Sequence, residues 1–149
     1  MQAAYMQKAL IEAKLAMQRD EVPVGAVLVD YKKSKIIACG GNTVIENNDP
    51  TAHAEINVIR LACREKSSTY LDDCDIYITL EPCAMCAQAI SNARIRRIYY
   101  GAYDSKSGGV DHGARVLESS SCHHKPEVYS GIMEEECASL LSNFFKGKR

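Results

Sequence analysis

The sequence predicts an α/β fold in which helices are layered on a mixed β-sheet. Stretches with apolar residues at helical spacing alternate along the chain with short β-branched runs, which is the pattern of a layered α/β domain. The first two β-branched runs are separated by only a short polar turn, which predicts an antiparallel hairpin in the sheet. At 149 residues the chain has the length of one core, so we expect a single domain over residues 1–149.

The N-terminal third is predicted to form one helix followed by the hairpin. Apolar residues at helical spacing, from Ala3 to Met17, predict an amphipathic helix over 2–19. The runs VGAVLVD (24–30) and SKIIACGG (34–41) are rich in apolar residues and predict the two hairpin strands. A polar loop follows them.

The middle of the chain is predicted to form a helix, a strand and a second helix. The first helix spans 52–65, and either Asp49 or Thr51 can serve as its N-cap. CDIYITL (74–80) predicts a buried strand. Pro82 is expected at the start of the next helix, where its missing N–H leaves no partner unpaired.

The last third contains two further strands and a terminal helix. RIRRIYYGA (94–102) alternates like a strand, and SKSGG (105–109) predicts a loop. Residues 110–124 fit neither pattern, and EVYSG (127–131) predicts a short strand. The tail opens with acidic and ends with basic residues, which suits the two ends of a helix dipole.

Composition excludes several classes of protein. The net charge is −1, 46% of residues are hydrophobic and 25% are charged, as in an ordinary globular protein. Apolar runs are too short for a membrane span and the first residues lack a signal-peptide pattern, so we expect a cytoplasmic protein without a membrane partner. Seven scattered cysteines argue against a secreted disulfide framework. The part after residue 93 is net basic, which leaves room for an RNA-facing surface.

The stretch TLEPCAMC contains a Cys-x-x-Cys pair that three kinds of chemistry could use. Cys83 and Cys86 are expected on one face of the first turn of a helix, where unpaired N–H groups and the dipole lower thiol pKa values. Such thiolates suit a redox pair, a structural zinc site or a catalytic metal site. By itself the pair does not distinguish among these three.

The stretch PTAHAEI supplies partners that favour the catalytic reading. His53 with the two cysteines makes three ligands and leaves a fourth tetrahedral position open, whereas closed structural zinc sites use four protein ligands. Glu55 is not needed as a ligand. A carboxylate beside an activated water can accept its proton and deliver it to a substrate.

The two stretches together carry a resemblance to a known family. His53-Ala54-Glu55 followed by Pro82-Cys83-Ala84-Met85-Cys86 resembles the signature of the zinc-dependent nucleoside and nucleobase deaminases. EVPVGAVLV, NDPTAHAEI, GAYDSKSGG and ECASLLSNFF extend the resemblance, over nearly the whole chain, to the bacterial tRNA-specific adenosine deaminases. The resemblance implies a three-layer α/β/α fold with a five-stranded mixed sheet, and a homodimer.

The resemblance also implies an activity and a set of site residues. The activity is conversion of the wobble adenosine of a tRNA anticodon to inosine, with attack by zinc-activated water and release of ammonia. One Zn²⁺ per subunit would be held by His53, Cys83 and Cys86, and Glu55 would be the catalytic acid and base. The tRNA anticodon stem-loop would be bound by five further residues: Asn42, Ala54 (through its backbone N–H), Asp104, Lys106 and Phe145.

Other functions compete with this one. A guanine, cytosine or nucleotide deaminase of the same fold would share the TLEPC stretch, but has no need of GAYDSKSGG or of the Phe-Phe-basic terminus. A thiol-redox protein or a structural zinc-binding protein would leave Glu55 dispensable. Glu81 is expected to lie near the pocket without a role in the chemistry. The five remaining cysteines are expected to pack as small apolar residues.

Overall fold

The computed structural model describes residues 2–148, in which helices and strands alternate. The strands are β1 (Gly25–Asp30), β2 (Lys35–Gly41), β3 (Cys74–Leu80), β4 (Arg97–Ala102) and β5 (Glu127–Tyr129). The helical elements are α1 (Gln2–Gln18), α2 (Ala54–Lys66), α3 (Ala84–Asn92), the 3₁₀ turn η1 (Val116–Glu118) and α4 (Glu134–Lys146).

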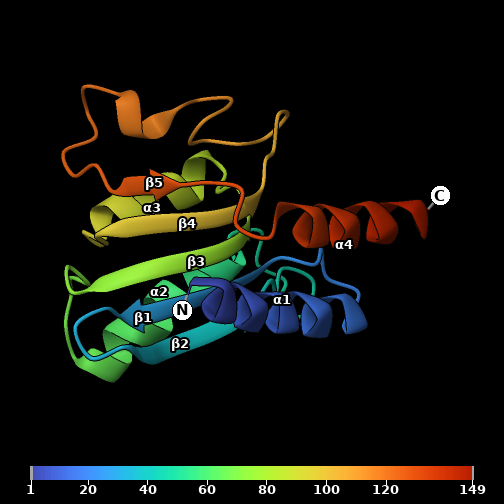
Figure 1. Cartoon of the computed structure of the whole chain (residues 1–149), viewed down its shortest axis with the longest axis horizontal. Helices are drawn as coiled ribbons and strands as arrows, with labels where there is room; N and C mark the ends of the chain where they lie inside the picture. The colour runs from blue at the N-terminus through green and yellow to red at the C-terminus, as the bar shows by residue number, and fades with distance from the viewer. Residues whose placement is uncertain (1, 149) are drawn as a thin grey trace.

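The five strands form one mixed sheet in the order β2-β1-β3-β4-β5 (Figure 1). β1 is antiparallel to both β2 and β3, whereas β3, β4 and β5 are parallel to one another. The predicted hairpin and the mixed sheet are therefore confirmed. Because β2 and β3 both run opposite to β1, they finish at the same end of the sheet. The segments that follow them, which lead into α2 and α3, start side by side.

Helices cover both faces of the sheet, as the three-layer prediction requires (Figure 1). On one face α2 and α3 pack over a core that includes Leu28, Ile76 and Ile98. On the other face α1 and α4 pack over a second core that includes Val27 and Tyr77. Successive strand residues alternate between these two cores, which explains why β1 and β3 are apolar along nearly their whole length.

Some predicted boundaries differ from the structure for local reasons. The predicted strand over 94–102 begins only at Arg97, because Arg94 has a left-handed backbone (φ 59°) in the turn that ends α3. In the stretch 110–124 the chain forms η1 within an irregular connection. The N-cap of α2 is His53, not Asp49 or Thr51, and the N-cap of α3 is Cys83, so Pro82 precedes the helix that it was expected to start.

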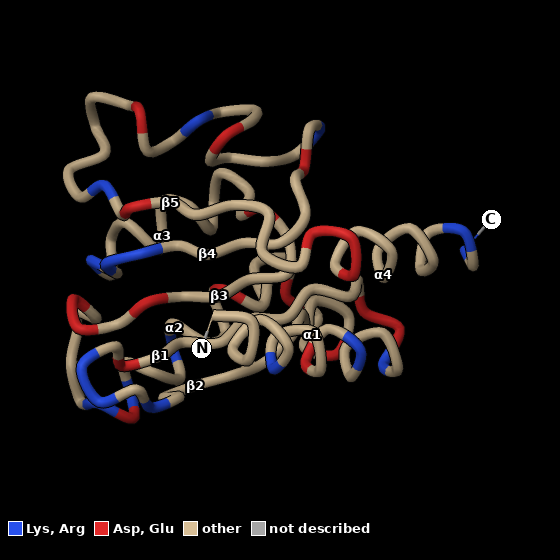
Figure 2. Tube along the Cα trace, viewed as in Figure 1, with Lys and Arg blue, Asp and Glu red and all other residues tan. Residues whose placement is uncertain are grey.

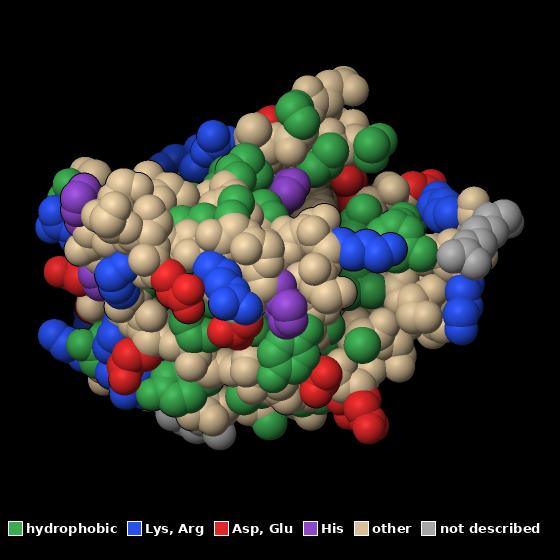
Figure 3. Space-filling view, turned by 90° about the horizontal axis from the view of Figure 1, so that it is seen from above, with side chains coloured by type: hydrophobic (Ala, Val, Ile, Leu, Met, Phe, Trp, Pro, Cys, Tyr) green, Lys and Arg blue, Asp and Glu red, His purple; other side chains and the backbone are tan. Residues whose placement is uncertain are grey.

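Acidic and basic residues separate to the two ends of the terminal helix. Glu134, Glu135 and Glu136 occupy the first turn of α4 and Lys146 the last, so both ends complement the helix dipole as predicted (Figure 2). On the face seen in Figure 3, lysine and arginine side chains are interspersed with acidic ones. Among residues 2–148, no helix combines the length and the apolar character needed to cross a membrane.

Candidate active site

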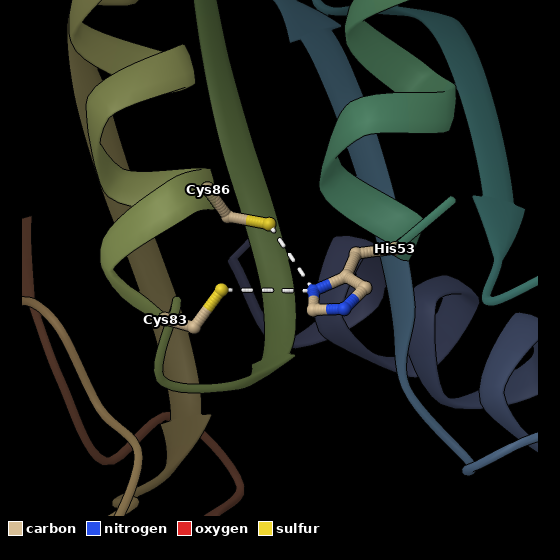
Figure 4. A group of neighbouring side chains, drawn as sticks. All are labelled: His53, Cys83 and Cys86. Atoms are coloured by element: carbon tan, nitrogen blue, oxygen red, sulfur yellow. Dashed lines mark hydrogen bonds between the residues drawn. The ribbon is translucent and has the colours of Figure 1, made fainter. Parts of the chain in front are cut away.

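The predicted metal ligands come from the starts of two helices. His53 is the N-cap of α2, Cys83 is the N-cap of α3, and Cys86 lies in the first turn of α3 (Figure 4). Both N-cap residues have extended backbone conformations, with ψ angles of 155° and 175°. The shared direction of β2 and β3 brings the two helix starts together, so ligands distant in sequence become neighbours.

The three ligand atoms converge on a common point (Figure 4). Nδ1 of His53 lies 3.6 Å from Sγ of Cys83 and 3.5 Å from Sγ of Cys86, and all three atoms lie within 4.8 Å of one another. Zn²⁺ with ordinary tetrahedral bonds to nitrogen and sulfur would separate such atoms by about 3.6 Å. One imidazole and two thiolates are also a donor set that zinc prefers. Geometry and chemistry therefore both fit zinc.

Hydrogen bonding within the cluster prepares Cys83 for metal binding. Its contact with Cys86 lowers the pKa of the Cys83 thiol to about 4, and the His53 ring and the Cys86 backbone N–H act in the same direction against the effect of burial. The same contact and burial raise the pKa of Cys86. A sulfur atom that is already a thiolate is the form that binds a metal.

Glu55 lies in the first turn of α2, two residues after His53, and only 4% of it is exposed. Burial is the main reason that its pKa is raised to about 7, and the nearby Cys83 sulfur contributes in the same direction. Glu55 lines the same cavity as His53 and Cys83. A carboxyl group held in that position can exchange protons with a molecule bound beside the cluster.

Asn42 is joined directly to the start of α2. Its side-chain Oδ1 accepts a hydrogen bond from the backbone N–H of Ala54 at 2.8 Å, and both residues are buried. The structure therefore gives this N–H a protein partner, whereas the sequence analysis expected it to be free for the substrate. The cause is that the N-cap His53 side chain makes no capping bond, so an amide from the loop after β2 caps the helix instead.

A cavity of about 190 Å³ contains part of the predicted site. Asn42, His53, Glu55, Cys83 and Asp104 line it, together with residues that the sequence analysis did not single out for the pocket: Val22, Val24, Leu80 and Ser107. Larger cavities lie elsewhere, including one of about 630 Å³ beside the end of α3, but their lining residues do not include the ligand cluster. Chemistry rather than size identifies the site.

Three of the five predicted substrate-binding residues do not line this cavity: Ala54, which is buried and bonded to Asn42, and the two exposed residues Lys106 and Phe145. Lys106 is exposed in the loop after β4, and Phe145 is 53% exposed near the end of α4, where its ring meets that of Phe144 edge to face. Contacts from Lys106 and Phe145 would therefore be made with parts of a substrate that extend beyond the cavity.

Two buried glutamates border the site and were not predicted to have a role. Glu21 accepts hydrogen bonds from the backbone N–H groups of Ile45 and Glu46, and so fixes the loop that follows Asn42. Glu81 accepts several from the loop after β4 and also lines the cavity. In TLEPC, Glu81 stands between the end of an apolar strand and a proline. This position is a sequence signal that could have identified Glu81 as a buried side chain with hydrogen-bond partners.

Comparisons with known proteins agree with the geometry. A family model described as MafB19-like deaminase matches residues 1–149. The tRNA-specific adenosine deaminase of Agrobacterium fabrum is 54% identical over 145 residues, which cover 97% of this chain and 94% of that protein. A solved structure from a study of A-to-I editing by tRNA A34 deaminases matches with a TM-score of 0.90 at 54% identity, over 93% of this chain and 99% of that one. A guanine deaminase structure from Bacillus subtilis matches with a TM-score of 0.63 at 40% identity, over 67% and 63%.

The mixed sheet, the ligand cluster and the buried glutamate beside it define a hydrolytic deaminase. The Agrobacterium fabrum tRNA-specific adenosine deaminase is 54% identical over 97% of this chain, and the Bacillus subtilis guanine deaminase is 40% identical over 67% of it. A guanine deaminase structure from Nitrosomonas europaea covers 95% of the chain at only 20% identity, so that match shows the fold alone. The chain belongs to the MafB19-like deaminase family, among the tRNA-specific adenosine deaminases.

Proposed function

We propose that this protein converts the wobble adenosine of a tRNA anticodon to inosine in the cytoplasm, and that residues 1–149 form one deaminase domain. The observation that carries the proposal is the buried Glu55 beside the His53, Cys83 and Cys86 cluster, in a cavity that Asn42 and Asp104 also line. The names of the full-length relatives support adenosine in tRNA as the substrate.

His53, Cys83 and Cys86 would hold one Zn²⁺ per subunit. When bound there, Zn²⁺ acts as a Lewis acid that makes a water molecule a competent nucleophile near neutral pH. The two cysteines would bind it as thiolates and the histidine through Nδ1, the atom that faces both sulfurs. Because all three ligands belong to helix starts packed on the sheet, the cluster is held by the fold and not by a mobile loop.

Glu55 would carry the protons of the reaction. It accepts a proton as water attacks the amino-bearing carbon of adenine, and delivers that proton to the adjacent ring nitrogen. It then assists transfer of a proton to the amino group, which leaves as ammonia while inosine remains. Its burial keeps the carboxyl group out of bulk water, so the proton passes between enzyme and substrate.

Asn42 would recognise the edge of the base. Its Oδ1 already accepts the Ala54 N–H, so the amide NH₂ group is the part that can donate to a ring nitrogen of the purine. This division makes the Asn42 side chain rigid before substrate arrives. Ala54 would act through its backbone N–H. This N–H would orient Asn42 by donating to its Oδ1, and the same N–H would also donate to the polar group on the reacting carbon of the substrate.

Asp104 at the wall of the cavity, with Lys106 and Phe145 outside it, would bind the rest of the anticodon stem-loop. Bases of a single-stranded loop can leave the stack and enter a pocket, which suits a small enzyme without a device for opening a duplex. Asp104 lines the cavity and accepts the backbone N–H of Lys106 in the same turn, and Phe145 presents an exposed ring on which a base can stack. Lys146 adds a positive charge at the end of α4; Lys148 pairs with Asp20, and Arg149 lies outside the described residues.

We further propose that the protein works as a homodimer. Support comes from exposed apolar side chains on the side of the molecule formed by α2 and α3, among them Leu61 and Met85, and from Ile45 in the neighbouring loop. Burying such side chains is favourable in a permanent interface. Light scattering of the purified protein should give twice the mass of one chain.

The deciding experiment uses an anticodon stem-loop RNA and compares wild type with Glu55→Ala. Wild type should convert the wobble adenosine to inosine, which sequencing reads as A-to-G. Glu55→Ala should retain about one zinc per chain and lose several orders of magnitude in activity, a loss typical of removing a proton-transfer group. Ammonia release from guanine without any A-to-G readout would favour the guanine deaminase alternative. Full activity of Glu55→Ala would contradict the mechanism and reopen the thiol-redox and structural-zinc alternatives.

A further inference from the structure

Glu81 is the most heavily hydrogen-bonded carboxylate at the site. Its side chain is fully buried between the end of β3 and the loop after β4. Oε1 accepts the backbone N–H of Asp104 at 3.0 Å and lies 2.8 Å from Nδ1 of His112. Oε2 accepts the backbone N–H groups of three successive residues at 2.9 to 3.3 Å: Val110, Asp111 and His112.

These bonds join both ends of one loop to a single group. Residues 104–112 leave the sheet at Asp104 and return past Glu81 at 110–112, so one carboxylate closes the loop at its base. Both oxygens of the Glu81 side chain accept backbone N–H groups, so the side chain acts as a carboxylate acceptor on each side. A charged acceptor forms stronger hydrogen bonds to N–H groups than a neutral one.

The loop is also shaped to approach Glu81 closely. A Cβ atom at Gly108 would collide with the Glu81 carboxylate, and one at Gly109 would collide with the backbone at the start of α3. Gly109 further donates its N–H to the carbonyl of Pro82 at 2.7 Å. The SKSGG stretch therefore needs glycines because the loop lies directly against the carboxylate and against the helix that carries Cys83.

The same loop provides the substrate-facing turn. Oδ1 of Asp104 accepts the N–H groups of Lys106 and Ser107 at 3.2 and 2.9 Å, which fixes a tight turn. Asp104 and Ser107 line the cavity. The position of this turn relative to the ligand cluster is thus set by the bond from the Asp104 N–H to Glu81, which is next but one to Cys83 in the sequence.

We propose that Glu81 is a positioning residue for RNA: its buried carboxylate holds residues 104–112 in the arrangement that presents Asp104 and Lys106 to nucleotides flanking the target adenosine. This inference rests on the proposed function and extends it to a residue that does not itself touch the reacting atoms. Its contribution is to substrate affinity, because the metal ligands and Glu55 belong to the helix starts and not to this loop.

The isosteric change Glu81→Gln tests the proposal without creating a cavity. An amide keeps one acceptor oxygen and replaces the other with an NH₂ group, which cannot accept from an N–H. If the oxygen stays at the Oε2 position to serve residues 110–112, the NH₂ group faces the Asp104 N–H. That bond is then lost, and the substrate-facing turn is released while residues 110–112 stay bound.

Asp30→Asn is a matched control at the opposite end of the sheet. Asp30 is also a buried carboxylate, and its Oδ1 accepts the backbone N–H groups of Lys32 and Lys33 at 3.0 Å. In the register of β1 with β3, Asp30 lies opposite Cys74 at the start of β3, whereas Glu81 follows the end of β3. The two variants therefore make the same chemical change to a buried, loop-binding carboxylate, and only one of these residues lies beside the site.

Two measurements on the zinc-loaded protein decide the matter. Hydrogen exchange should show faster exchange of the peptide that contains Asp104 in Glu81→Gln, and unchanged exchange there in Asp30→Asn. Stem-loop deamination should show KM raised about tenfold in Glu81→Gln, the size expected for losing one or two hydrogen bonds to a charged acceptor, with kcat within about threefold of wild type. Asp30→Asn should keep the wild-type KM even where its melting temperature falls.

The outcomes separate this inference from the proposed function. Wild-type exchange of the Asp104 peptide in Glu81→Gln overturns the inference, and so does faster exchange that leaves KM unchanged. A loss confined to kcat, or loss of zinc, would place Glu81 in the chemistry or the metal site and would also overturn it. Failure of wild type to deaminate any stem-loop refutes the proposed function itself, and the positioning role for RNA falls with it.

Discussion

The side-chain oxygen of Asn42 accepts the backbone N–H of Ala54, so the residue proposed to bind the base also caps the helix that carries Glu55. The residue proposed to recognise the base and the residue proposed to carry the proton are therefore mechanically joined. A substitution at Asn42 affects both, and the two effects can be separated by choosing what the new side chain retains.

We predict that Asn42→Ala lowers both stability and activity, whereas Asn42→Asp lowers activity alone. Alanine removes the capping oxygen, which should cost about 1 kcal/mol of unfolding free energy. Aspartate keeps an acceptor for the Ala54 N–H but has no NH₂ group to donate to the base. Thermal unfolding and stem-loop deamination, measured on the same preparations, check both statements. Equal stability of the alanine variant and wild type would contradict the capping role.

Removing the metal should destabilise the protein reversibly. The ligand set belongs to the folded chain, so zinc at 100 times its dissociation constant adds about 2.7 kcal/mol to the free energy of unfolding. We expect a chelator to lower the melting temperature by roughly 5 °C or more, and added zinc to restore it. Cys83→Ser should show the low melting temperature without a chelator. Cys63→Ser, which changes a thiol on α2 outside the cluster, should respond to the chelator like wild type.

Phe145 should contribute to RNA binding and not to stability. Its ring is 53% exposed, whereas that of Phe144 is more buried and contacts Lys148. Stacking of a base on an aromatic ring is worth about 1 to 3 kcal/mol, so Phe145→Ala should raise the stem-loop KM by about fivefold or more with an unchanged melting temperature. Phe144→Ala is the matched control and should lower the melting temperature. An unchanged KM for Phe145→Ala would exclude stacking at this position.

The ion pair between Asp75 and Arg96 should stabilise the fold far from the site. Two bonds of 2.9 and 2.7 Å join the side chains, Asp75 is 4% exposed, and the Arg96 guanidinium lies over the Tyr31 ring. Asp75→Ala leaves a partly buried arginine without its partner, so we expect a loss of about 2 kcal/mol in urea unfolding. The exposed pair of Arg97 with Glu127 is the control, and Glu127→Ala should change stability little.

Two glycines in paired strands should respond oppositely to alanine. A Cβ atom at Gly25 would collide with the backbone of α1 at Ala9 and Ala13, whereas one at Gly40 would meet only a methyl group of Val58 at an ordinary 3.8 Å. Gly25→Ala should therefore cost about 3 kcal/mol through displacement of α1. Gly40→Ala should be neutral or slightly stabilising. Denaturant unfolding of both variants checks the close packing of α1 on the sheet.

Helical spacing of apolar residues predicted α1, apolar runs predicted the hairpin and β3, and the acidic start and basic end of the tail predicted α4. The metal ligands and Glu55 could be predicted because their chemistry restricts the residue types at each position. The Asn42 cap could not be predicted, since it joins residues twelve positions apart through a fold that the sequence does not display. The connection after Asp104 gave no periodic signal either, because the buried carboxylate of Glu81 holds it in place and not a repeated set of apolar contacts.

The placement of the ligands on two helix starts has a consequence for the order of folding. His53 and Cys83 are thirty residues apart in the chain and meet only when β2 and β3 have both paired with β1. Capture of the proposed zinc with native affinity should therefore be a late event that reports a correctly registered central sheet. A nascent chain that ends before Cys86 lacks the ligand set, so zinc uptake during synthesis should begin only after the first three strands have left the ribosome.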